Sequence, residues 1–283
     1  AKKGRFRVVF ADLTDPARLA EALAERPDLV WIETPSNPLL RITDIRHVAQ
    51  AAHAIGATVV VDNTFLSPVL QRPLALGGDV VVHSTTKYIN GHSDVVGGAV
   101  IAKDGAVHEK LGWWANCLGL TGAPFDSFLT LRGLRTLAPR MRAHEENAAL
   151  VAELLVDHAA VARVFWPGLR SHEGHLLAAR QQHGFGAMLS FELDGGEAAI
   201  EAFLDGLDCF SLAESLGGVE SLVAHPATMT HASMAPAARR NAGISDALLR
   251  LSVGIEDGAD LCADLEAALA RAAACAPARK VRA

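Results

Sequence analysis

Short apolar runs alternate with helical patterns from the start of the sequence to about residue 103. This alternation is typical of β-α-β units around a parallel sheet. The runs are rich in valine with little polar interruption, which is typical of strands in a sheet that is covered on both faces. The predicted strands are residues 7–10, Leu29–Glu33, Thr58–Asp62, 79–83 and 99–103.

Two helices are predicted between these strands. Pro16–Ala24 follows Asp15, a favourable N-cap residue, and begins with proline, which is favoured at the first helical position. Residues 44–55 repeat apolar side chains at helical spacing and end before Gly56. Both segments are expected to be crossover helices.

The pattern changes in the second half of the chain. Residues 126–157 form a long helical pattern, which Pro139 is expected to kink or divide. We place a domain boundary after residue 142, between a large domain (1–142) and a smaller C-terminal α+β domain (143–283). In the smaller domain the predicted strands are 185–193 and 248–253, and the predicted helices are 197–207 and 259–274.

Composition narrows the possible partners. The 283 residues carry a net charge of −6, and no lysine and arginine cluster is long enough to follow a phosphate backbone, so nucleic acid and anionic membranes are not expected partners. The 4 cysteines form no CxxC pair, which fits a reducing cytoplasm. No apolar run approaches the roughly 18 residues of a membrane span. We expect a cytoplasmic protein that acts on small molecules.

Polar side chains follow three predicted strands directly. Asn37 follows the second strand, Asp62 ends the third, and Ser84, Thr86 and Lys87 follow the fourth. Each of them alone could cap a turn or a helix. Ligands in open parallel sheets, however, bind at the carboxyl ends of the strands. Three polar clusters at successive strand ends predict a ligand crevice.

Lys87 suggests what the ligand is, because a lysine beside hydroxyl groups can form a Schiff base. Pyridoxal phosphate would use Lys87 on its aldehyde, Ser84 and Thr86 on its phosphate, and Asp62 on its pyridinium nitrogen. The rival interpretation of Ser84-x-x-Lys87 is an acylating serine motif, but the companion S-D-N and K-T-G strings are missing from the sequence.

Two other cofactor classes are not expected. His83, His92 and Asp94 suggest a metal site, but no spacing puts two imidazoles on one helix face, so we predict no metal. The paired glycines form no G-x-G-x-x-G motif after a strand, so a dinucleotide is not predicted.

Arg250 lies inside the apolar strand predicted at 248–253. A guanidinium in such a strand is costly unless it has a partner, and a substrate carboxylate would be a suitable one. An internal ion pair or an outward-facing position would also explain it.

Several longer motifs resemble one known family. Along essentially its whole length, the chain resembles the cysteine and methionine metabolism family of pyridoxal-phosphate enzymes. Within this family it resembles the bacterial γ-synthase branch. The γ-lyases share much of the same sequence. The family motifs are VVDNTF at 60–65, HSTTKY at 83–88, GHSDVVGG at 91–98 and SLAESLGGVES at 211–221. The branch motifs are WWAN at 113–116, FGAMLSFEL at 185–193 and MTHA at 229–232.

The resemblance implies an overall architecture. It is the α/β fold of the aspartate-aminotransferase type (fold type I), with a mostly parallel sheet in the large domain and a smaller C-terminal α+β domain. It also implies a homotetramer built as a dimer of dimers. Relatives have an N-terminal segment that supplies further cofactor contacts and that this sequence lacks, so we expect the large domain to be N-terminally incomplete and the sequence to be part of a longer chain.

The resemblance also assigns roles to individual residues. Lys87 carries the cofactor and later moves protons, Asp62 pairs with the ring nitrogen, and Ser84 and Thr86 hold the phosphate. Asn37 hydrogen-bonds the cofactor's phenolic oxygen and contributes to substrate binding.

Three further residues are implied to bind substrate. Arg250 and Ser215 take the α-carboxylate, and Glu214 lies near the distal amino group. The implied reaction is γ-replacement in methionine biosynthesis, which joins an O-succinyl- or O-acetylhomoserine to cysteine and gives cystathionine. One alternative is γ-elimination of cystathionine, and a second is a non-catalytic truncated scaffold.

Overall fold

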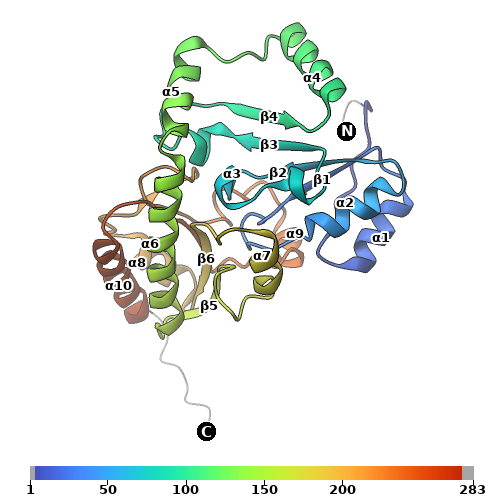
Figure 1. Cartoon of the computed structure of the whole chain (residues 1–283). Helices are drawn as coiled ribbons and strands as arrows, with labels where there is room; N and C mark the ends of the chain where they lie inside the picture. The colour runs from blue at the N-terminus through green and yellow to red at the C-terminus, as the bar shows by residue number, and fades with distance from the viewer. Residues whose placement is uncertain (1–3, 276–283) are drawn as a thin grey trace.

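The computed structural model describes residues 4–275, in which two sheets are joined by one long helix (Figure 1). The first sheet has the strand order β1-β2-β3-β4, with the first three strands parallel and β4 antiparallel to β3. Four of the five strands predicted for this region are confirmed, with ends shifted by a residue where they differ. They are β1 (Leu29–Glu33), β2 (Thr58–Asp62), β3 (Val80–Ser84) and β4 (Gly98–Ala102).

The two predicted helices are confirmed, and both cover one face of this sheet. They are α1 (Pro16–Ala24) and α2 (Ile45–His53), and each begins after an aspartate whose side chain accepts a hydrogen bond from a backbone N–H of the first turn. The apolar stripe of α2 packs with Val30, Val59 and Val61 of the strands. The crossover helices therefore form one side of the first core.

The opposite face of the sheet is partly open within the described residues. Leu29 and Trp31 on β1 are 49% and 52% exposed, and Val100 on β4 is also exposed. The prediction of a sheet covered on both faces is therefore wrong for its outer strands in this part of the chain. Valine content alone does not distinguish a face that is covered by helices from one that is not.

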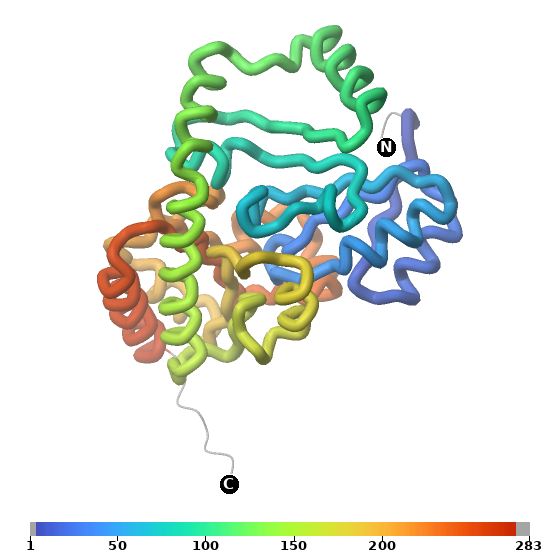
Figure 2. The backbone as a smooth tube through the Cα atoms, viewed as in Figure 1, coloured from blue at the N-terminus to red at the C-terminus, as the bar shows by residue number. Residues whose placement is uncertain are grey.

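The prediction of a strand at residues 7–10 is also wrong. This segment is not paired with any strand of residues 4–275, and the side chain of Phe10 is 94% exposed. Figure 2 shows the dark-blue N-terminal segment running down the same side of the molecule as α1 and α2. A strand needs a neighbouring edge to pair with, and a local apolar run does not supply one.

The second sheet has the strand order β5-β6-β9-β8-β7, antiparallel except for the β7–β8 pair. Its core includes Phe191 and Phe203, whose rings meet edge to face with centroids 5.5 Å apart. Its elements are β5 (Val161–Phe165), β6 (Met188–Leu193), α8 (Gly196–Leu204), β7 (Ser211–Leu212), β8 (Leu222–Ala224), β9 (Leu248–Ser252) and α10 (Gly258–Cys275). The predicted strands and helices of this part are confirmed: both strands are shorter than predicted, α8 begins one residue earlier and ends three residues earlier, and α10 extends one residue further at each end.

The long helical pattern is divided, as predicted, just before Pro139. It forms α5 (Pro124–Leu134) and α6 (Leu137–Asp157), and the proline lies in the first turn of α6, where it is tolerated. Figure 1 shows α6 running from the first sheet to the second. The start of α6 packs in a cluster with Tyr88, whereas Val151 belongs to the core of the second sheet.

The predicted boundary after residue 142 falls inside α6, between these two packing environments. The division into residues 1–142 and 143–283 stays a prediction. The remaining elements are α3 (Ser67–Leu70), η1 (Pro73–Leu76), η2 (Thr85–Ile89), α4 (Gly105–Leu118), α7 (His175–Gln181) and α9 (Pro236–Asn241).

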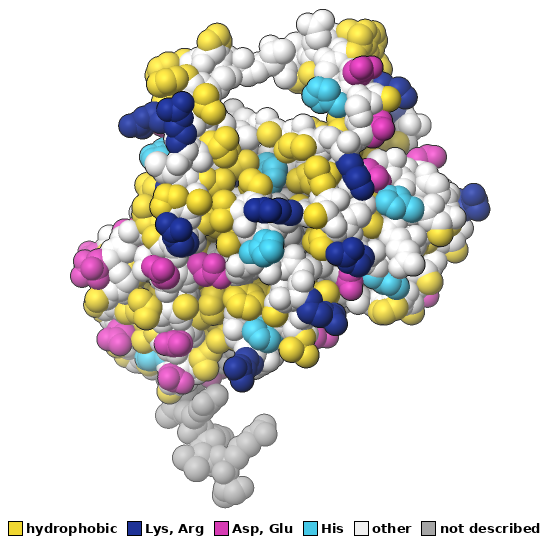
Figure 3. All heavy atoms as spheres, in the orientation of Figure 1, with side chains coloured by type: hydrophobic (Ala, Val, Ile, Leu, Met, Phe, Trp, Pro, Cys, Tyr) yellow, Lys and Arg dark blue, Asp and Glu magenta, His cyan; other side chains and the backbone are white. Residues whose placement is uncertain are grey.

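The surface carries both signs of charge. Figure 3 shows acidic side chains gathered at the lower left of the face drawn, where α10 lies, and lysines and arginines scattered across its middle. Within residues 4–275, no helix combines the length and the hydropathy that a membrane crossing requires.

Candidate functional site

The carboxyl ends of the three parallel strands lie side by side. In the pairing register, Glu33 at the end of β1 is opposite Asp62 at the end of β2, and Asp62 is opposite Val82 of β3. The loop after β2 is bonded to the end of β3, because Ser84 N–H donates to Thr64 Oγ1 over 2.9 Å. The predicted polar clusters therefore share one edge of the sheet.

Lys87 lies in η2, the irregular turn that follows β3. Its backbone is non-helical within the turn (φ −88°, ψ −134°), and its side chain is half-buried. Lys87 Nζ lies 3.1 Å from Ser215 Oγ, across 128 residues of sequence. Burial, and then the nearby positive charge of Arg250, lower the pKa of Lys87 below its ordinary value. The amine is thus more readily neutral than a surface lysine, as a base or nucleophile must be.

Arg250 lies at the centre of β9, paired with Ser190 and Ala224 on the neighbouring strands, and is 2% exposed. Its guanidinium donates to the carbonyls of Glu214 and Ser215, over 2.9 and 3.0 Å. Burial lowers the pKa of Arg250 to about 10. Among the described residues, Arg250 Nε has no hydrogen-bond partner. A buried guanidinium with a free donor is suited to binding a carboxylate.

The loop that contains Ser215 is docked on the lysine turn. Gly217 has φ +72°, and a Cβ on this residue would lie 2.9 Å from the backbone nitrogen of Tyr88. Gly217 N–H donates to Ser252 Oγ, and Val219 N–H donates to the carbonyl of Gly91. Glycine is needed here both for the backbone conformation and for the close approach.

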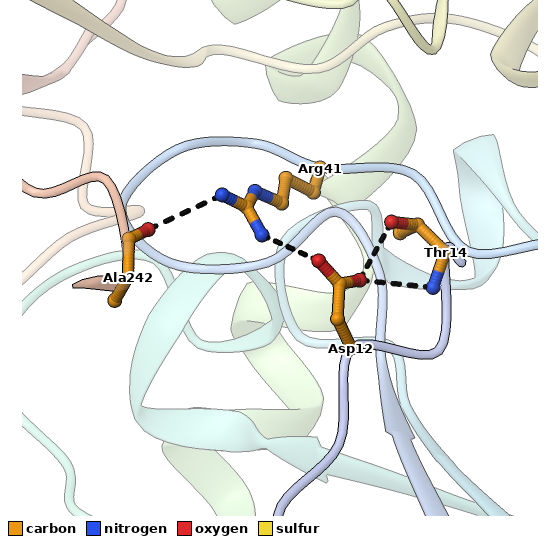
Figure 4. Close-up of polar contacts among 4 residues, drawn as sticks. All are labelled: Asp12, Thr14, Arg41 and Ala242. Carbon is orange, nitrogen blue, oxygen red and sulfur yellow. Dashed lines mark hydrogen bonds and ion pairs between the residues drawn. The ribbon is translucent and has the colours of Figure 1, made fainter. Parts of the chain in front are cut away.

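The loop of Asn37 is anchored on both sides. Asn37 N–H donates to Glu33 Oε1 over 2.7 Å, and Asn37 Oδ1 accepts a hydrogen bond from Arg250 over 3.1 Å. In the same loop, Arg41 forms an ion pair with Asp12 over 2.6 Å and donates to the carbonyl of Ala242 over 3.2 Å (Figure 4). The first strand loop is thus connected to the C-terminal part of the chain.

The structure brings part of the predicted set into direct contact. Lys87, Ser215, Arg250 and Asn37 are joined by the hydrogen bonds given above, and the carbonyl of Glu214 takes part while its side chain is exposed.

The three remaining predicted residues lie at the adjacent strand ends. Asp62 Oδ1 accepts a hydrogen bond from Thr64 N–H, and Thr86 Oγ1 accepts one from Gly97 N–H, both over 3.0 Å. Ser84 ends β3 and is half-buried. Within residues 4–275, no side-chain hydrogen bond joins these three residues to the set that surrounds Lys87.

The donor set fits pyridoxal phosphate. The half-buried amine of Lys87, with its lowered pKa, suits an aldehyde, and the hydroxyls of Thr86 and Ser84 suit a phosphate. The carboxylate of Asp62, on the neighbouring strand β2, suits a ring nitrogen. Lys87, Thr86, Ser84 and Asp62 are therefore the residues that would hold this cofactor.

Arg140 was not identified by the sequence analysis. It lies on the buried side of α6, is 5% exposed, and donates hydrogen bonds to the carbonyls of Tyr88 and Ile89 in the lysine turn. The pattern that identified Arg250, a charged side chain among apolar positions, could also have identified Arg140. Leu137 and Met141 lie on either side of Arg140 on the same helix.

Known proteins resemble the chain over most of its length. The family model described as "Cys/Met metabolism PLP-dependent enzyme" matches residues 1–270. The chain belongs to this family.

Individual relatives of this PLP-dependent family agree. Cystathionine gamma-synthase of Escherichia coli (strain K12) is 60% identical over 266 residues, which cover 94% of this chain and 69% of that protein. Cystathionine gamma-lyase of Dictyostelium discoideum is 50% identical, covering 92% of this chain and 67% of that protein. The crystal structure of cystathionine gamma-synthase from Xanthomonas oryzae pv. oryzae, in complex with cystathionine, has a TM-score of 0.95 and 68% identity, and covers 97% of this chain and 71% of that chain.

These similarities confirm several predictions. The family and its α/β fold with a mostly parallel sheet are as predicted, and the family's cofactor is pyridoxal phosphate. The roles of the individual site residues stay predictions.

Proposed function

We propose that the chain joins an O-acylhomoserine, either the O-succinyl or the O-acetyl ester, to L-cysteine by γ-replacement and so forms cystathionine for methionine biosynthesis. One observation carries the proposal. The amine of Lys87 lies 3.1 Å from Ser215 Oγ, and the backbone of Ser215 holds the buried guanidinium of Arg250. A base and a carboxylate anchor thus meet on one loop. The relatives that bear the name cystathionine gamma-synthase support the same reaction.

Substrate binding is assigned to the buried end of this site. Arg250 and Ser215 take the α-carboxylate of the amino acid, with the free Nε of Arg250 as an available donor. Asn37 lies on the other side of the guanidinium and orients it. Glu214 precedes Ser215 in an exposed position, where its carboxylate can receive the distal ammonium group of the product.

When bound, pyridoxal phosphate supplies an aldehyde that links to amines and a ring that absorbs negative charge from the substrate. We propose that Lys87 carries it, that Ser84 and Thr86 hold its phosphate, that Asp62 keeps its ring nitrogen protonated, and that Asn37 bonds its phenolic oxygen.

Lys87 is the proton-transfer residue of the proposed reaction. Its amine takes the proton from Cα of the homoserine ester and must give it up, to a position that the bound cofactor would supply, before it takes a second proton from Cβ. The acyloxy group then leaves Cγ with the electron pair of the C–O bond, as a carboxylate. The thiol of cysteine loses its proton to solvent as its sulfur forms the bond to Cγ, and the two protons taken earlier return to Cβ and Cα. The lowered pKa of Lys87 assists each removal, because a larger fraction of the amine is neutral.

A relative named cystathionine gamma-lyase at 50% identity supports a second candidate, the γ-elimination that splits cystathionine into cysteine, 2-oxobutanoate and ammonia. The same site residues serve both directions. Turnover on an O-acylhomoserine with cysteine, compared with turnover on cystathionine alone, separates them. Turnover on neither, with no cofactor bound, would support the scaffold alternative.

We propose a cytoplasmic homotetramer, supported by the absence of CxxC pairs in the sequence and by the family resemblance. We also propose that residues 1–142 form the cofactor-binding unit and residues 143–283 the second unit, supported by the change in packing along α6. Light scattering tests the assembly.

The deciding experiment compares Lys87→Ala with Lys103→Ala, a control at an exposed position. Visible absorbance is recorded on adding pyridoxal phosphate, followed by borohydride reduction and peptide mapping. We expect a reduced adduct on Lys87 in the wild type and in the control, and none in Lys87→Ala, which should also lose turnover. An adduct on another lysine, or full activity of Lys87→Ala, would overturn the assignment.

A further inference from the structure

The turn that carries Lys87 ends on a buried arginine. Arg140 donates from Nη1 to the carbonyl of Tyr88 over 2.8 Å and from Nη2 to the carbonyl of Ile89 over 3.3 Å. The same Nη2 also donates to the carbonyl of Gly133 over 2.9 Å, at the end of α5. One guanidinium thus connects the lysine turn to the junction between α5 and α6.

These contacts satisfy groups that would otherwise be unpaired. The last carbonyls of a helical turn have no partner within the turn, and a buried carbonyl without a hydrogen bond is costly. Tyr88 is fully buried and Ile89 is 8% exposed. Within residues 4–275, no main-chain N–H donates to either carbonyl. Arg140 is therefore their donor in the described chain.

Two glycines leave room for this arrangement. Gly91 has φ +74°, and a Cβ on it would lie 2.6 Å from Arg140 Cζ, well inside van der Waals contact. A Cβ on Gly133 would lie 2.9 Å from the carbonyl carbon of Asn90. The backbone at Gly91 thus lies close against the guanidinium, and the backbone at Gly133 lies close against the lysine turn.

The guanidinium is also fixed on its own helix. Arg140 Nε donates to Thr136 Oγ1 over 3.1 Å, one turn earlier. Because a planar fork can serve several carbonyls at once and an ammonium is a single point of contact, lysine at this position would keep only part of the set.

We propose that Arg140 is a positioning residue, which holds the backbone of the 85–91 turn so that the amine of Lys87 points at Ser215 and the substrate carbon. This inference rests on the proposed role of Lys87. Arg140 itself touches no substrate in this proposal, and it acts only through the carbonyls of the turn.

The test measures the turn directly. Amide hydrogen exchange is followed by mass spectrometry in the full chain with pyridoxal phosphate added, for Arg140→Met, Arg140→Lys and the control Arg142→Met, which changes an exposed arginine of the same helix. We expect about tenfold faster exchange in the peptide covering 85–91 for Arg140→Met, since hydrogen bonds from a charged donor are lost. Arg140→Lys should be intermediate, and the control should match the wild type.

A second readout separates positioning from general stability. We expect kcat of Arg140→Met to fall by about tenfold while KM changes little, because the carboxylate anchor at Arg250 is untouched. Exchange in the β6 and β9 peptides should be unchanged. If Arg140→Met does not fold, Arg140→Lys carries the test, because it keeps only part of the hydrogen bonds and should show the same pattern with smaller changes.

Two results would overturn the inference. They are unchanged exchange at 85–91 in a folded Arg140→Met protein, and an equal rise in exchange across β6 and β9. A wild-type protein that shows no turnover on either substrate would instead contradict the proposed function and leave the exchange result valid.

Discussion

His144 is a buried histidine whose titration should control the acid stability of the protein. It is fully buried on α6, its Nδ1 lies 2.7 Å from the carbonyl of Val253, and its ring meets the ring of Tyr88 edge to face. Burial lowers the pKa of His144 from 6.5 to about 4. The folded protein therefore keeps this imidazole neutral at a pH where the unfolded chain protonates it.

The sign and size of the effect follow from linkage. Between about pH 6.5 and pH 4 the unfolded state binds more protons than the folded state, so the free energy of unfolding falls as the pH falls. Each unit of difference in pKa corresponds to about 1.4 kcal/mol, so the full effect of His144 is about 3 kcal/mol at acid pH. Between about pH 8 and pH 5 the expected loss is about 2 kcal/mol.

The substitution His144→Asn isolates this effect, since an asparagine nitrogen can still donate to Val253 while the titrating group is removed. Urea unfolding at about pH 8 and pH 5 is measured for the wild type, for His144→Asn and for His47→Asn, a control at an exposed histidine. The loss between the two pH values should be smaller by about 2 kcal/mol in His144→Asn and unchanged in the control. Equal losses in all three proteins would refute the reasoning.

Three other changes have expected outcomes. Phe203→Ala removes a fully buried ring from the core of the second sheet and should lower the free energy of unfolding by about 3–5 kcal/mol in urea titrations. Asp264→Ala removes the carboxylate that accepts the backbone N–H groups of residues 208–210, over 2.8–3.1 Å, and should lower it by about 2–3 kcal/mol. Arg250→Leu removes the positive charge beside Lys87, so the pKa of Lys87 should rise, and amine-selective labelling of Lys87 should move to higher pH.

Each of these outcomes has a control. Phe125→Ala, at a side chain that is 67% exposed, should change stability little. Asp260→Ala changes an exposed acid one turn earlier on α10 and controls for the loss of charge at Asp264. An unchanged or lowered pKa of Lys87 in a folded Arg250→Leu protein would contradict the electrostatic argument.

Local patterns predicted the strand ends and the residues that follow them. Asp62, Ser84 and Lys87 are placed by short valine-rich runs that need only their own periodicity to be identified. Arg250 was identified as a candidate for binding a carboxylate because a charge in an apolar strand needs a partner. In both cases the evidence lies within a few residues of the feature.

Partners distant in the sequence could not be predicted in this way. The carbonyls that hold Arg250 come from residues 214 and 215, and the arginine that holds the lysine turn comes from α6. The error at residues 7–10 has the same origin, since pairing depends on an edge supplied elsewhere. β5, β7 and β8 were not predicted, and of these β7 and β8, with 2 and 3 residues, are too short to show a period.

The uninterrupted path of α6 limits how the two halves of the chain can move. Its first turns hold the backbone on which Lys87 is mounted, and its later turns belong to the core that supports Arg250 on β9. A helix of 21 residues without a break behaves as a stiff rod. Together with the loop of residues 214–219, which is bonded to the lysine turn, α6 therefore fixes the distance between Lys87 and Arg250, and we expect the two sheets that carry these residues to move as one body.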